Sequence, residues 1–273
     1  MAIRKLRAAA AAAVLTLSLG LTACSSDDDA TSASSKTTTT SSAPSTDGTK
    51  AASTASADAA TECTYSLADA KTGDTVNGRE FAFCQAEALT KLEGYVLTRV
   101  QTDDKAEEFT SVTRVQVDPL EVEITSEEDS GGTSSVVIVD GKAYIKLATD
   151  KEYAEVPADT TDQKLTYFAN LPSTWEKNLN PKLAAEETDP DLILTVLGTD
   201  KVDDVDVTVF EFELDHGTAI TRRTFYVDSR FLTLKSELTF ADSDEPDKLL
   251  LKTSSIMSEI DQPQDIADPR TTN

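Results

Sequence analysis

Hydrophobic and polar positions alternate most clearly in two hairpin patterns. Val136–Val139 and Lys142–Leu147 flank Asp140-Gly141, and Asp-Gly between two apolar runs is typical of a type I′ turn. In the second arm Ala143, Ile145 and Leu147 share one face, whereas Lys142, Tyr144 and Lys146 share the other. Phe225–Asp228 and Phe231–Phe240 predict a second hairpin, with its turn at Asp228-Ser229-Arg230.

Further strand patterns lie on both sides of these hairpins. The strand formers at Tyr95–Val100, Val112–Val117 and Leu249–Ile256 each predict a strand, as does the alternation through Leu120, Val122 and Ile124. Within Val202–Leu214 the apolar residues fall at the odd-numbered positions 205, 207 and 209 and then at the even-numbered positions 210, 212 and 214. Such a phase slip indicates either a β-bulge or a strand that is buried on both faces.

Helical spacing appears in two places. Apolar residues between Glu80 and Leu92 follow a helical period, and Gly94 lies just beyond as a stop signal. Strand alternation then ceases between Asp162 and Leu197, where the spacing predicts short helices.

The first of these short helices contains Leu165, Phe168 and Leu171 and is expected to end at Pro172. Trp175, Leu179 and Leu183 continue at a spacing of four, although Pro181 interrupts them. A last short helix is expected over Asp191–Leu197, with Asp189 as its cap, Pro190 in its first turn and Gly198 as its stop.

The resulting order is one helix, about six strands, short helices and about four strands. Strands and helices in segregated runs predict an α+β fold. We expect a curved antiparallel sheet, an open half-barrel, wrapped over the short helices in a single domain of residues 63–273.

Residues 1–23 resemble a signal peptide. Arg4, Lys5 and Arg7 precede an apolar run of about 14 residues, which is too short for a membrane span but suits a signal core. Leu21-Thr22-Ala23-Cys24 then resembles the bacterial lipobox, whose cysteine becomes the lipidated N-terminus. The alternative is an ordinary secretory signal with an incidental cysteine at Cys24.

Residues 24–62 are expected to form a disordered tether. Residues 25–60 contain no apolar side chain larger than alanine, so they cannot bury enough surface to offset the entropy of ordering. A flexible segment of this length has an end-to-end distance of roughly 30–35 Å. Its Ser and Thr content also allows O-glycosylation, although a bare spacer is the simpler interpretation.

The two remaining cysteines, Cys63 and Cys84, are expected to pair in an exported protein. A disulfide there would close a loop of about 20 residues and stabilise the fold by about 3 kcal/mol. The alternative is a redox-active pair, but the spacing is far from C-x-x-C.

Charge and composition exclude several functions. The 273 residues carry a net charge of −24, and loss of the three basic signal residues leaves 22 basic against 49 acidic residues, a net charge of −27. Nucleic acid is therefore not an expected partner. A single histidine excludes a multi-histidine metal site, and no metal or cofactor is expected.

No catalytic motif was found, so an enzyme is not expected. His216 lies in Leu214-Asp215-His216-Gly217, a turn pattern, and the acidic runs at Glu127-Glu128-Asp129 and 242–247 lack calcium-binding spacing. A hydrolase that uses paired carboxylates is a third-ranked alternative.

The lipobox at Leu21–Cys24 and three further segments resemble the LolA-like lipid carriers of the actinobacterial LppX–LprG type. The further segments are Val-Asp-Gly-Lys-Ala-Tyr-Ile-Lys-Leu at 139–147, Leu-Gly-Thr-Asp-Lys-Val-Asp-Asp-Val-Asp-Val at 197–207 and Phe-Tyr-Val-Asp-Ser-Arg-Phe-Leu-Thr-Leu-Lys at 225–235. The resemblance covers about residues 90–260. It implies a half-barrel with an apolar cavity that binds acylated lipids and moves them between membrane layers.

The resemblance implies that the chain is a cell-envelope lipoprotein that binds or transfers a lipid or other apolar ligand. We expect a monomer, anchored by lipid at Cys24 to the outer face of the cell membrane, with a lipid or lipoglycan ligand. The alternative is an interaction or sensory lipoprotein with the same fold, a closed core and no lipid cargo. Six residues are candidates for the cavity lining, although for each one taken singly ordinary core is the favoured interpretation: Tyr144, Phe168, Leu171, Trp175, Phe225 and Leu234.

Overall fold

The computed structural model describes residues 62–104, 108–127, 132–245 and 249–271. The predicted signal peptide, Cys24 and almost all of the predicted tether lie outside the described residues. Parts of both acidic runs also lie outside them.

The described elements follow the predicted order of one helix, strands, short helices and strands. The helices are the 3-10 helix Leu67–Asp69, α2 (Gly78–Leu89), α3 (Gln163–Asn178) and α4 (Pro181–Glu186). The first seven strands are β1 (Thr75–Asn77), β2 (Gly94–Asp103), β3 (Glu108–Gln116), β4 (Glu121–Glu127), β5 (Thr133–Val139), β6 (Lys142–Lys146) and β7 (Ala154–Glu155). The last five are β8 (Ile193–Val202), β9 (Val205–Asp215), β10 (Ala219–Val227), β11 (Thr233–Asp242) and β12 (Leu249–Ser258).

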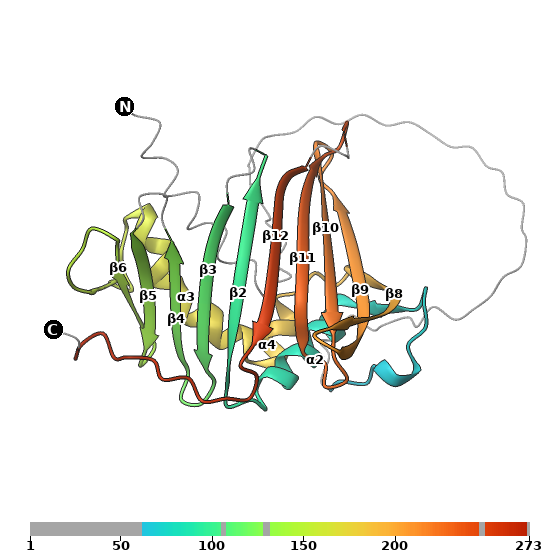
Figure 1. Ribbon diagram of the computed structural model, residues 1–273, viewed down its shortest axis with the longest axis horizontal. Coiled ribbons are helices and arrows are strands. Elements are labelled where there is room, and N and C mark those ends of the chain that lie inside the picture. The colour runs from blue at the N-terminus through green and yellow to red at the C-terminus, as the bar shows by residue number, and fades with distance from the viewer. Residues whose placement is uncertain (1–61, 105–107, 128–131, 246–248, 272–273) are drawn as a thin grey trace, which may run out of the picture.

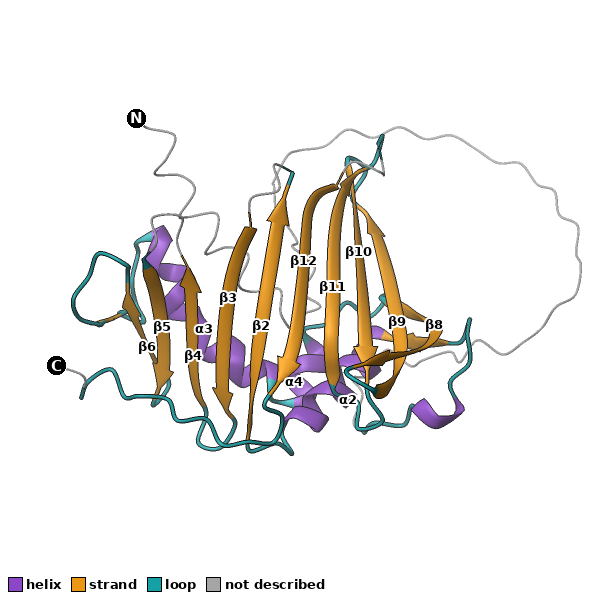
Figure 2. Ribbon diagram, in the orientation of Figure 1, coloured by secondary structure: helices purple, strands orange, loops and turns teal. Residues whose placement is uncertain are grey.

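All twelve strands form one sheet, in the order β1-β8-β9-β10-β11-β12-β2-β3-β4-β5-β6-β7. Each neighbouring pair is antiparallel, and the sheet does not close on itself. The three α-helices lie behind the sheet in Figures 1 and 2: α2 and α4 lie toward the lower ends of the strands, and α3 rises behind β4 and β5. This architecture confirms the predicted α+β class with a curved open sheet over short helices.

Both predicted hairpins are present. Asp140 and Gly141 have φ values of 51° and 70°, the left-handed conformation that a type I′ turn requires at both positions. In the β10–β11 turn, an Asp228 carboxylate oxygen accepts hydrogen bonds from the backbone N–H groups of Arg230 and Leu232 at 2.9 and 3.0 Å. The side chain of Asp228 thereby fixes the turn without help from glycine.

The run between residues 202 and 214 belongs to two strands, because it is divided by a turn at Asp203 and Asp204, both with positive φ. The phase slip at Phe210 lies within the second of them. Within β9, the residues from Val207 to Phe210 are all buried, which confirms a strand that is covered on both faces.

The helix predicted over Asp191–Leu197 is wrong, because this segment opens β8. Leu192, Leu194 and Val196 are buried, whereas Ile193 and Leu197 are exposed, and this period of two belongs to a strand. Asp189 and Pro190 form a turn ahead of the strand rather than a helix start. Gly198 lies inside β8, where its register against β9 shifts.

Helix α3 does not end at Pro172 but continues through it to Asn178. Leu171 and Trp175, one turn apart on either side of the proline, are both buried in the core. This packing offsets the hydrogen bond that proline cannot donate. Pro181 begins a new helix, because the Asn180 side chain caps α4 by accepting from the N–H groups of Lys182 and Leu183.

Helix α2 ends at Leu89, so Gly94 is not its stop signal but the first residue of β2. A Cβ atom at Gly94 would lie 2.7 Å from the carbonyl oxygens of Gln262 and Val115. The C-terminal segment runs past this point, along the lower ends of β2 to β5 (Figure 1). It is held there by the N–H group of Asp261, which donates to the Gly94 carbonyl at 2.9 Å.

Cys63 and Cys84 form a disulfide, as the cysteine count predicted. The bond joins the start of the described chain to the buried face of α2, where Cys84 is 1% exposed.

The double substitution Cys63→Ala with Cys84→Ala is expected to lower the free energy of unfolding by about 3 kcal/mol, because the loop between the two positions is no longer constrained in the unfolded chain. Urea unfolding of the oxidised parent and the double variant measures the difference. Equal unfolding midpoints and slopes would contradict it.

The substitution Gly94→Ala is expected to destabilise the fold by about 1–3 kcal/mol, because two backbone carbonyls leave no room for the added methyl group. Thr98→Ala, in the same strand, serves as the control and should cost less than about 1 kcal/mol. A Gly94→Ala variant as stable as the control would show that the C-terminal segment can move aside freely.

Candidate functional site

The helix-side face of the sheet, which we call the inner face, carries the hydrophobic core. Directly paired residues of antiparallel strands share a face, so the strand register arranges this face in rows that run across the sheet. We name each row by its member on β2. The Leu97 row is apolar apart from Thr113 and contains Met257, Leu97, Thr113, Ile124, Val136 and Ile145.

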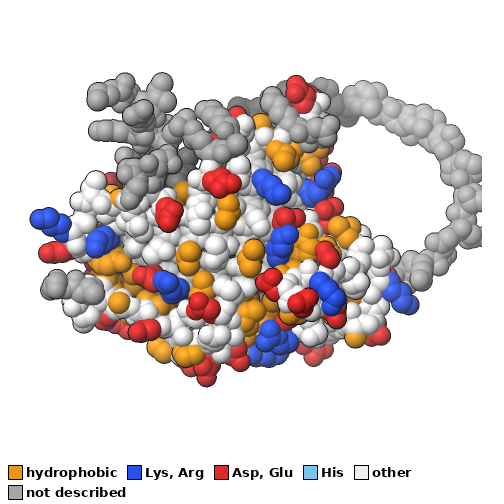
Figure 3. Space-filling model, viewed as in Figure 1, with side chains coloured by type: hydrophobic (Ala, Val, Ile, Leu, Met, Phe, Trp, Pro, Cys, Tyr) orange, Lys and Arg blue, Asp and Glu red, His pale blue; other side chains and the backbone are white. Residues whose placement is uncertain are grey.

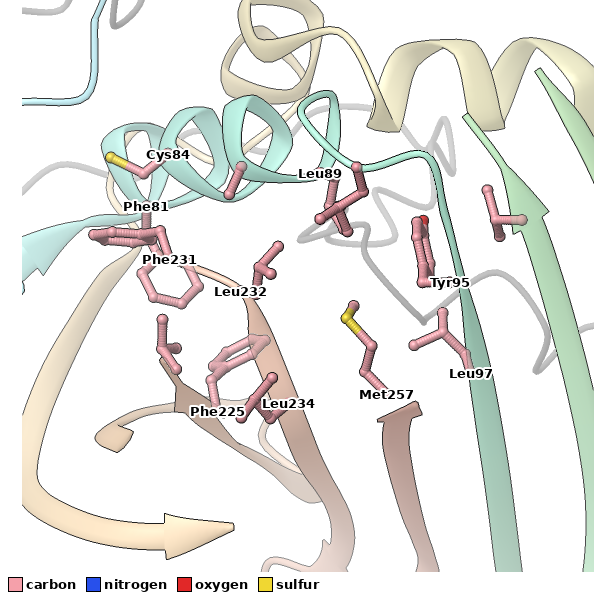
Figure 4. Close-up of a cluster of buried hydrophobic side chains, with 14 of the residues drawn as sticks. Phe81, Cys84, Leu89, Tyr95, Leu97, Phe225, Phe231, Leu232, Leu234 and Met257 are labelled. Atoms are coloured by element: carbon pink, nitrogen blue, oxygen red, sulfur yellow. The ribbon is translucent and has the colours of Figure 1, made fainter. Parts of the chain in front are cut away.

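Helix α2 covers the lower part of the inner face with aromatic packing. The Phe81 ring lies 5.2 Å from Phe210, 5.1 Å from Phe225 and 5.8 Å from Phe231, measured between ring centroids. Figure 4 shows Phe81 and Leu89 of α2 directed toward the side chains that rise from the sheet. All four phenylalanines are almost fully buried, so this part of the face is closed core.

Five of the six predicted lining residues meet in this core. Leu171, Trp175, Phe225 and Leu234 belong to one buried cluster, and the half-buried Phe168 packs against it. Their contacts are those of packed core side chains. Both interpretations from the sequence, a cavity lining and ordinary core, are compatible with these contacts.

Tyr144 does not join the other five. It is paired with Val137, and both lie on the opposite face from Val136, Ile138 and Ile145 of the core cluster. The Tyr144 hydroxyl donates to Glu155 at 3.3 Å. In the sequence, Tyr144 alternates in phase with Lys142 and Lys146. Its position on the face opposite the core agrees with that alternation and not with its choice as a cavity-lining residue.

Polar residues interrupt the inner face above the Leu97 row. The Arg99 row contains Phe210, Phe225, Ser236, Ser255, Arg99 and Ser111. The next row, named for Gln101, contains Phe212, Arg223, Leu238, Thr253, Gln101 and Phe109. Arg99 and Arg223 are 7% and 3% exposed, which is unusual for a charged side chain.

Burial changes the acid–base properties of both arginines. Removal from water and, as the smaller contribution, the positive charge of Arg99 together lower the pKa of Arg223 to about 10. Burial also lowers the pKa of Arg99, while the nearby Tyr167 hydroxyl of α3 acts in the opposite direction. Both groups remain cationic at neutral pH, so the inner face holds two neighbouring positive charges.

Sequence reasoning missed both arginines. A signal was present, since Arg99 has the same strand parity as Tyr95 and Leu97, and Arg223 has the parity of Phe225. A charged residue at a core position of an alternating strand is the pattern that would have found them.

Beside Arg223 and in the row above it, the inner face carries further hydrophobic residues that are only half-buried. The upper hydrophobic residues, as we call them, are Phe109, Leu214, Leu238, Phe240 and Leu251. No described helix lies behind the upper parts of β10, β11 and β12 in Figure 1. This hydrophobic surface is therefore not packed against a helix of the described chain.

A groove of about 630 Å³ lies at a different place, beside the disulfide. It is bounded by the start of the described chain, α2 and the lower ends of β9 and β10. Its lining mixes apolar and charged side chains, among them Tyr65, Leu67, Ala88, Lys91, Asp206 and Phe231.

The outer face of the sheet is a solvated surface. Arg114 contacts Glu123 at 2.9 Å, and Arg222 contacts Glu213 at 2.6 Å. Figure 3 shows small groups of hydrophobic side chains between charged ones on this side of the molecule. Such exposed ion pairs contribute little to stability but keep the face polar.

His216 lies in the turn between β9 and β10, as predicted. It is exposed, its backbone N–H donates to the Ala219 carbonyl at 2.9 Å, and its Nε2 atom lies 3.1 Å from the Thr221 hydroxyl. Among the described residues, no group of three or more His, Cys, Asp or Glu side chains is arranged to hold a metal ion. Within the same residues, no helix combines the length and the apolar character that a membrane crossing needs.

No family model matches the chain, and comparison with curated protein sequences also gives no match. Among solved structures, the fold is similar to that of the Mycobacterium tuberculosis lipoprotein LppX, with a TM-score of 0.44 and 10% identity over 68% of this chain and 97% of LppX. It is also similar to LprF from Mycobacterium bovis, with a TM-score of 0.42 and 12% identity over 73% of this chain and 99% of LprF. A LolA superfamily protein from Nitrosomonas europaea has a TM-score of 0.28 and 10% identity over 72% of this chain and 98% of its own. LppX and LolA are the names that the sequence resemblance gave.

The aromatic contacts of the inner face predict that alanine substitutions at two neighbouring residues lower the unfolding free energy by very different amounts. Phe225→Ala is expected to cost about 3–5 kcal/mol of unfolding free energy, because it leaves a cavity beside Phe81 and Phe210. Tyr226→Ala, on the outer face of the same strand, is the matched control and should cost clearly less. Chemical denaturation of both variants gives the comparison, and equal losses would contradict the assignment of faces.

Proposed function

We propose that this chain is a lipid-anchored protein of the cell envelope that binds a lipid or another apolar ligand on the inner face of its sheet. The observation that supports this best is the group of upper hydrophobic residues, which lie on the same face as the core but beyond the helices. An apolar surface that is set into a concave site is the usual form of a binding site for an apolar ligand.

The physical basis of binding would be burial of hydrocarbon. Each methylene group that leaves water contributes about 0.8 kcal/mol. The upper residues offer Phe and Leu side chains in two rows: Leu214, Phe240 and Leu251 share a row with Thr221 and Asp103, whereas Leu238 and Phe109 lie in the Gln101 row. Affinity would therefore depend mainly on chain length.

The envelope location is the second part of the proposal. The lipobox pattern at Leu21–Cys24 supports it, because a lipidated cysteine would anchor the chain, and the Ser/Thr-rich segment 25–60 would separate the folded domain from the bilayer. The disulfide between Cys63 and Cys84 also fits an oxidising, exported environment.

Mass spectrometry of organic extracts tests the ligand. The exported full chain carrying Cys24→Ala, which removes its own anchor, is expected to release a stoichiometric lipid after purification. Phe240→Glu places a charge among the upper hydrophobic residues and should abolish this lipid. Thr239→Glu, the neighbouring position on the outer face, should not change it.

An extract without lipid, from protein that also takes up no radiolabelled oleate or methyl oleate, would overturn the proposal. It would favour a closed domain that contacts a protein partner. Loss of lipid in both glutamate variants would show that binding does not take place on the inner face.

A further inference from the structure

The groove beside the disulfide has an apolar floor, and its lining contains none of the upper hydrophobic residues. Cys84, Ala88, Val207, Val227 and Phe231 line it and are at most 6% exposed. Its volume of about 630 Å³ is typical of a site that accepts a ligand. The walls around this floor carry backbone groups that indicate which kind of ligand fits.

One wall of the groove is the start of the described chain. Cys63 and Tyr65 line the groove, and the backbone groups of Cys63, Thr64 and Tyr65 make no hydrogen bond with another residue of the described chain. Side chains hold the segment instead, through the disulfide and through an edge-to-face contact between Tyr65 and Phe231, with ring centroids 6.4 Å apart. The N–H and C=O groups of this wall are therefore available to a partner.

A second wall is the outer edge of β8. Strand β1 and the residues that lead to it cover this edge only as far as Leu197. At the other end of the strand, a two-residue turn makes Val202 and Val205 a hydrogen-bonded pair. Because the bonds of an antiparallel pair alternate, Thr199 directs its N–H and C=O groups away from β9. Thr199 lines the groove, so this wall also offers backbone groups to a partner.

An extended polypeptide matches walls of this kind. A hydrocarbon chain has no donors or acceptors, whereas a strand presents N–H and C=O groups along each side and turns alternate side chains toward one face. Addition of a peptide strand to an open sheet edge is a recurring mode of recognition, in which backbone pairing gives affinity and a pocket for side chains gives specificity.

Charge at the groove favours a basic partner. The two cations of the lining and Lys201 of the neighbouring hairpin are each paired with a carboxylate: Lys91 with Glu87 at 3.1 Å, Arg230 with Asp228 at 2.9 Å and Lys201 with Asp206 at 2.7 Å. The β8–β9 hairpin adds the carboxylates of Asp200, Asp203 and Asp204, and Lys201 is the one cation among residues 198–207. The hairpin beside the groove is therefore negative, and the whole chain has a net charge of −24.

We propose that this groove binds an extended, basic segment of a protein partner. The backbone of the segment pairs with Thr199 and with residues 63–65, an apolar side chain rests on the floor, and basic side chains face the carboxylates of the β8–β9 hairpin. The inference goes beyond the proposed function, because the lipid would lie on the inner face and the peptide in the groove.

Three fluorescein-labelled peptides test it by fluorescence anisotropy with the exported full chain carrying Cys24→Ala. The first has four Lys-Val repeats, the second has four Glu-Val repeats, and the third is the first peptide with a methyl group on every valine nitrogen. The first should bind at least about tenfold more tightly than either of the others, because they lack the positive charge or the backbone donors. Its affinity should also fall as salt is raised, since exposed charges are screened.

Amide hydrogen exchange locates the peptide. In the complex with the first peptide, the amides of Thr64, Tyr65 and Thr199 should exchange at least about tenfold more slowly, because each is protected by a new hydrogen bond or by exclusion of water. The amides of Phe240 and its neighbours in β11 should exchange at an unchanged rate.

Two variants assign binding to the groove. Ala68→Trp fills the groove from an exposed position of its lining and should weaken the first peptide at least about tenfold, whereas Ala267→Trp, exposed in the C-terminal segment, is the matched control. Asp203→Asn with Asp204→Asn removes two charges but keeps a residue type that accepts positive φ, and should weaken binding about threefold to tenfold.

The control for the charge variant is Asp244→Asn with Glu245→Gln, two exposed carboxylates in another turn of the sheet. Equal binding of the three peptides, or no binding of the first, would overturn the inference and leave the proposed function standing. Loss of binding in Phe240→Glu but not in Ala68→Trp would place the peptide on the inner face and also overturn it. The peptide comparison needs no groove substitution, so it decides the matter even if Ala68→Trp fails to fold.

Discussion

A twelve-stranded sheet that does not close must keep one whole face away from water by other means. In a closed barrel the opposite wall covers the inner face, but here the cover comes from three short helices and from side chains of the sheet itself. Behind β10, β11 and β12 the helices reach only the lower part of the strands (Figure 1). Their limited extent produces the sequence of closed core, polar belt and half-buried hydrophobic surface along the inner face.

The covered part is held together by aromatic packing and by one covalent bond. Phe81 of α2 contacts rings from β9, β10 and the turn after β10, so a single side chain joins segments that are far apart in the chain. The disulfide at Cys84, on the same helix, adds the start of the described chain to this assembly.

The buried arginines are costly to the folded state, because two like charges are removed from water in one place. Ser236, Ser255 and Thr253 lie on the two strands between them, together with Leu238. The ion pairs of the outer face show no comparable cost, since they remain in contact with solvent.

Much of this architecture follows from the sequence, because strand alternation and turn residues act locally. The Asp140-Gly141 hairpin, the helix after Cys63 and the pairing of the cysteines were predicted from short segments, and the structure has each of them. Local reasoning was wrong where tertiary packing decided: Leu192–Leu197 became a strand because β1 and β9 lie beside it, and α3 continued through Pro172 because both of its turns are buried.

The site itself was only half visible in the sequence. Five lining residues could be chosen because aromatic and leucine side chains at periodic positions point inward, but Tyr144 shows that the choice of face needs the sheet. The meeting of Arg99 and Arg223 could not be predicted, because it depends on β12 pairing with β2 and on the register of four strands. The sequence by itself determined which residues form strands, turns and helices, since these are local preferences. Only the tertiary structure decided which residues share one surface, because register between distant strands is set by the packing of the whole sheet.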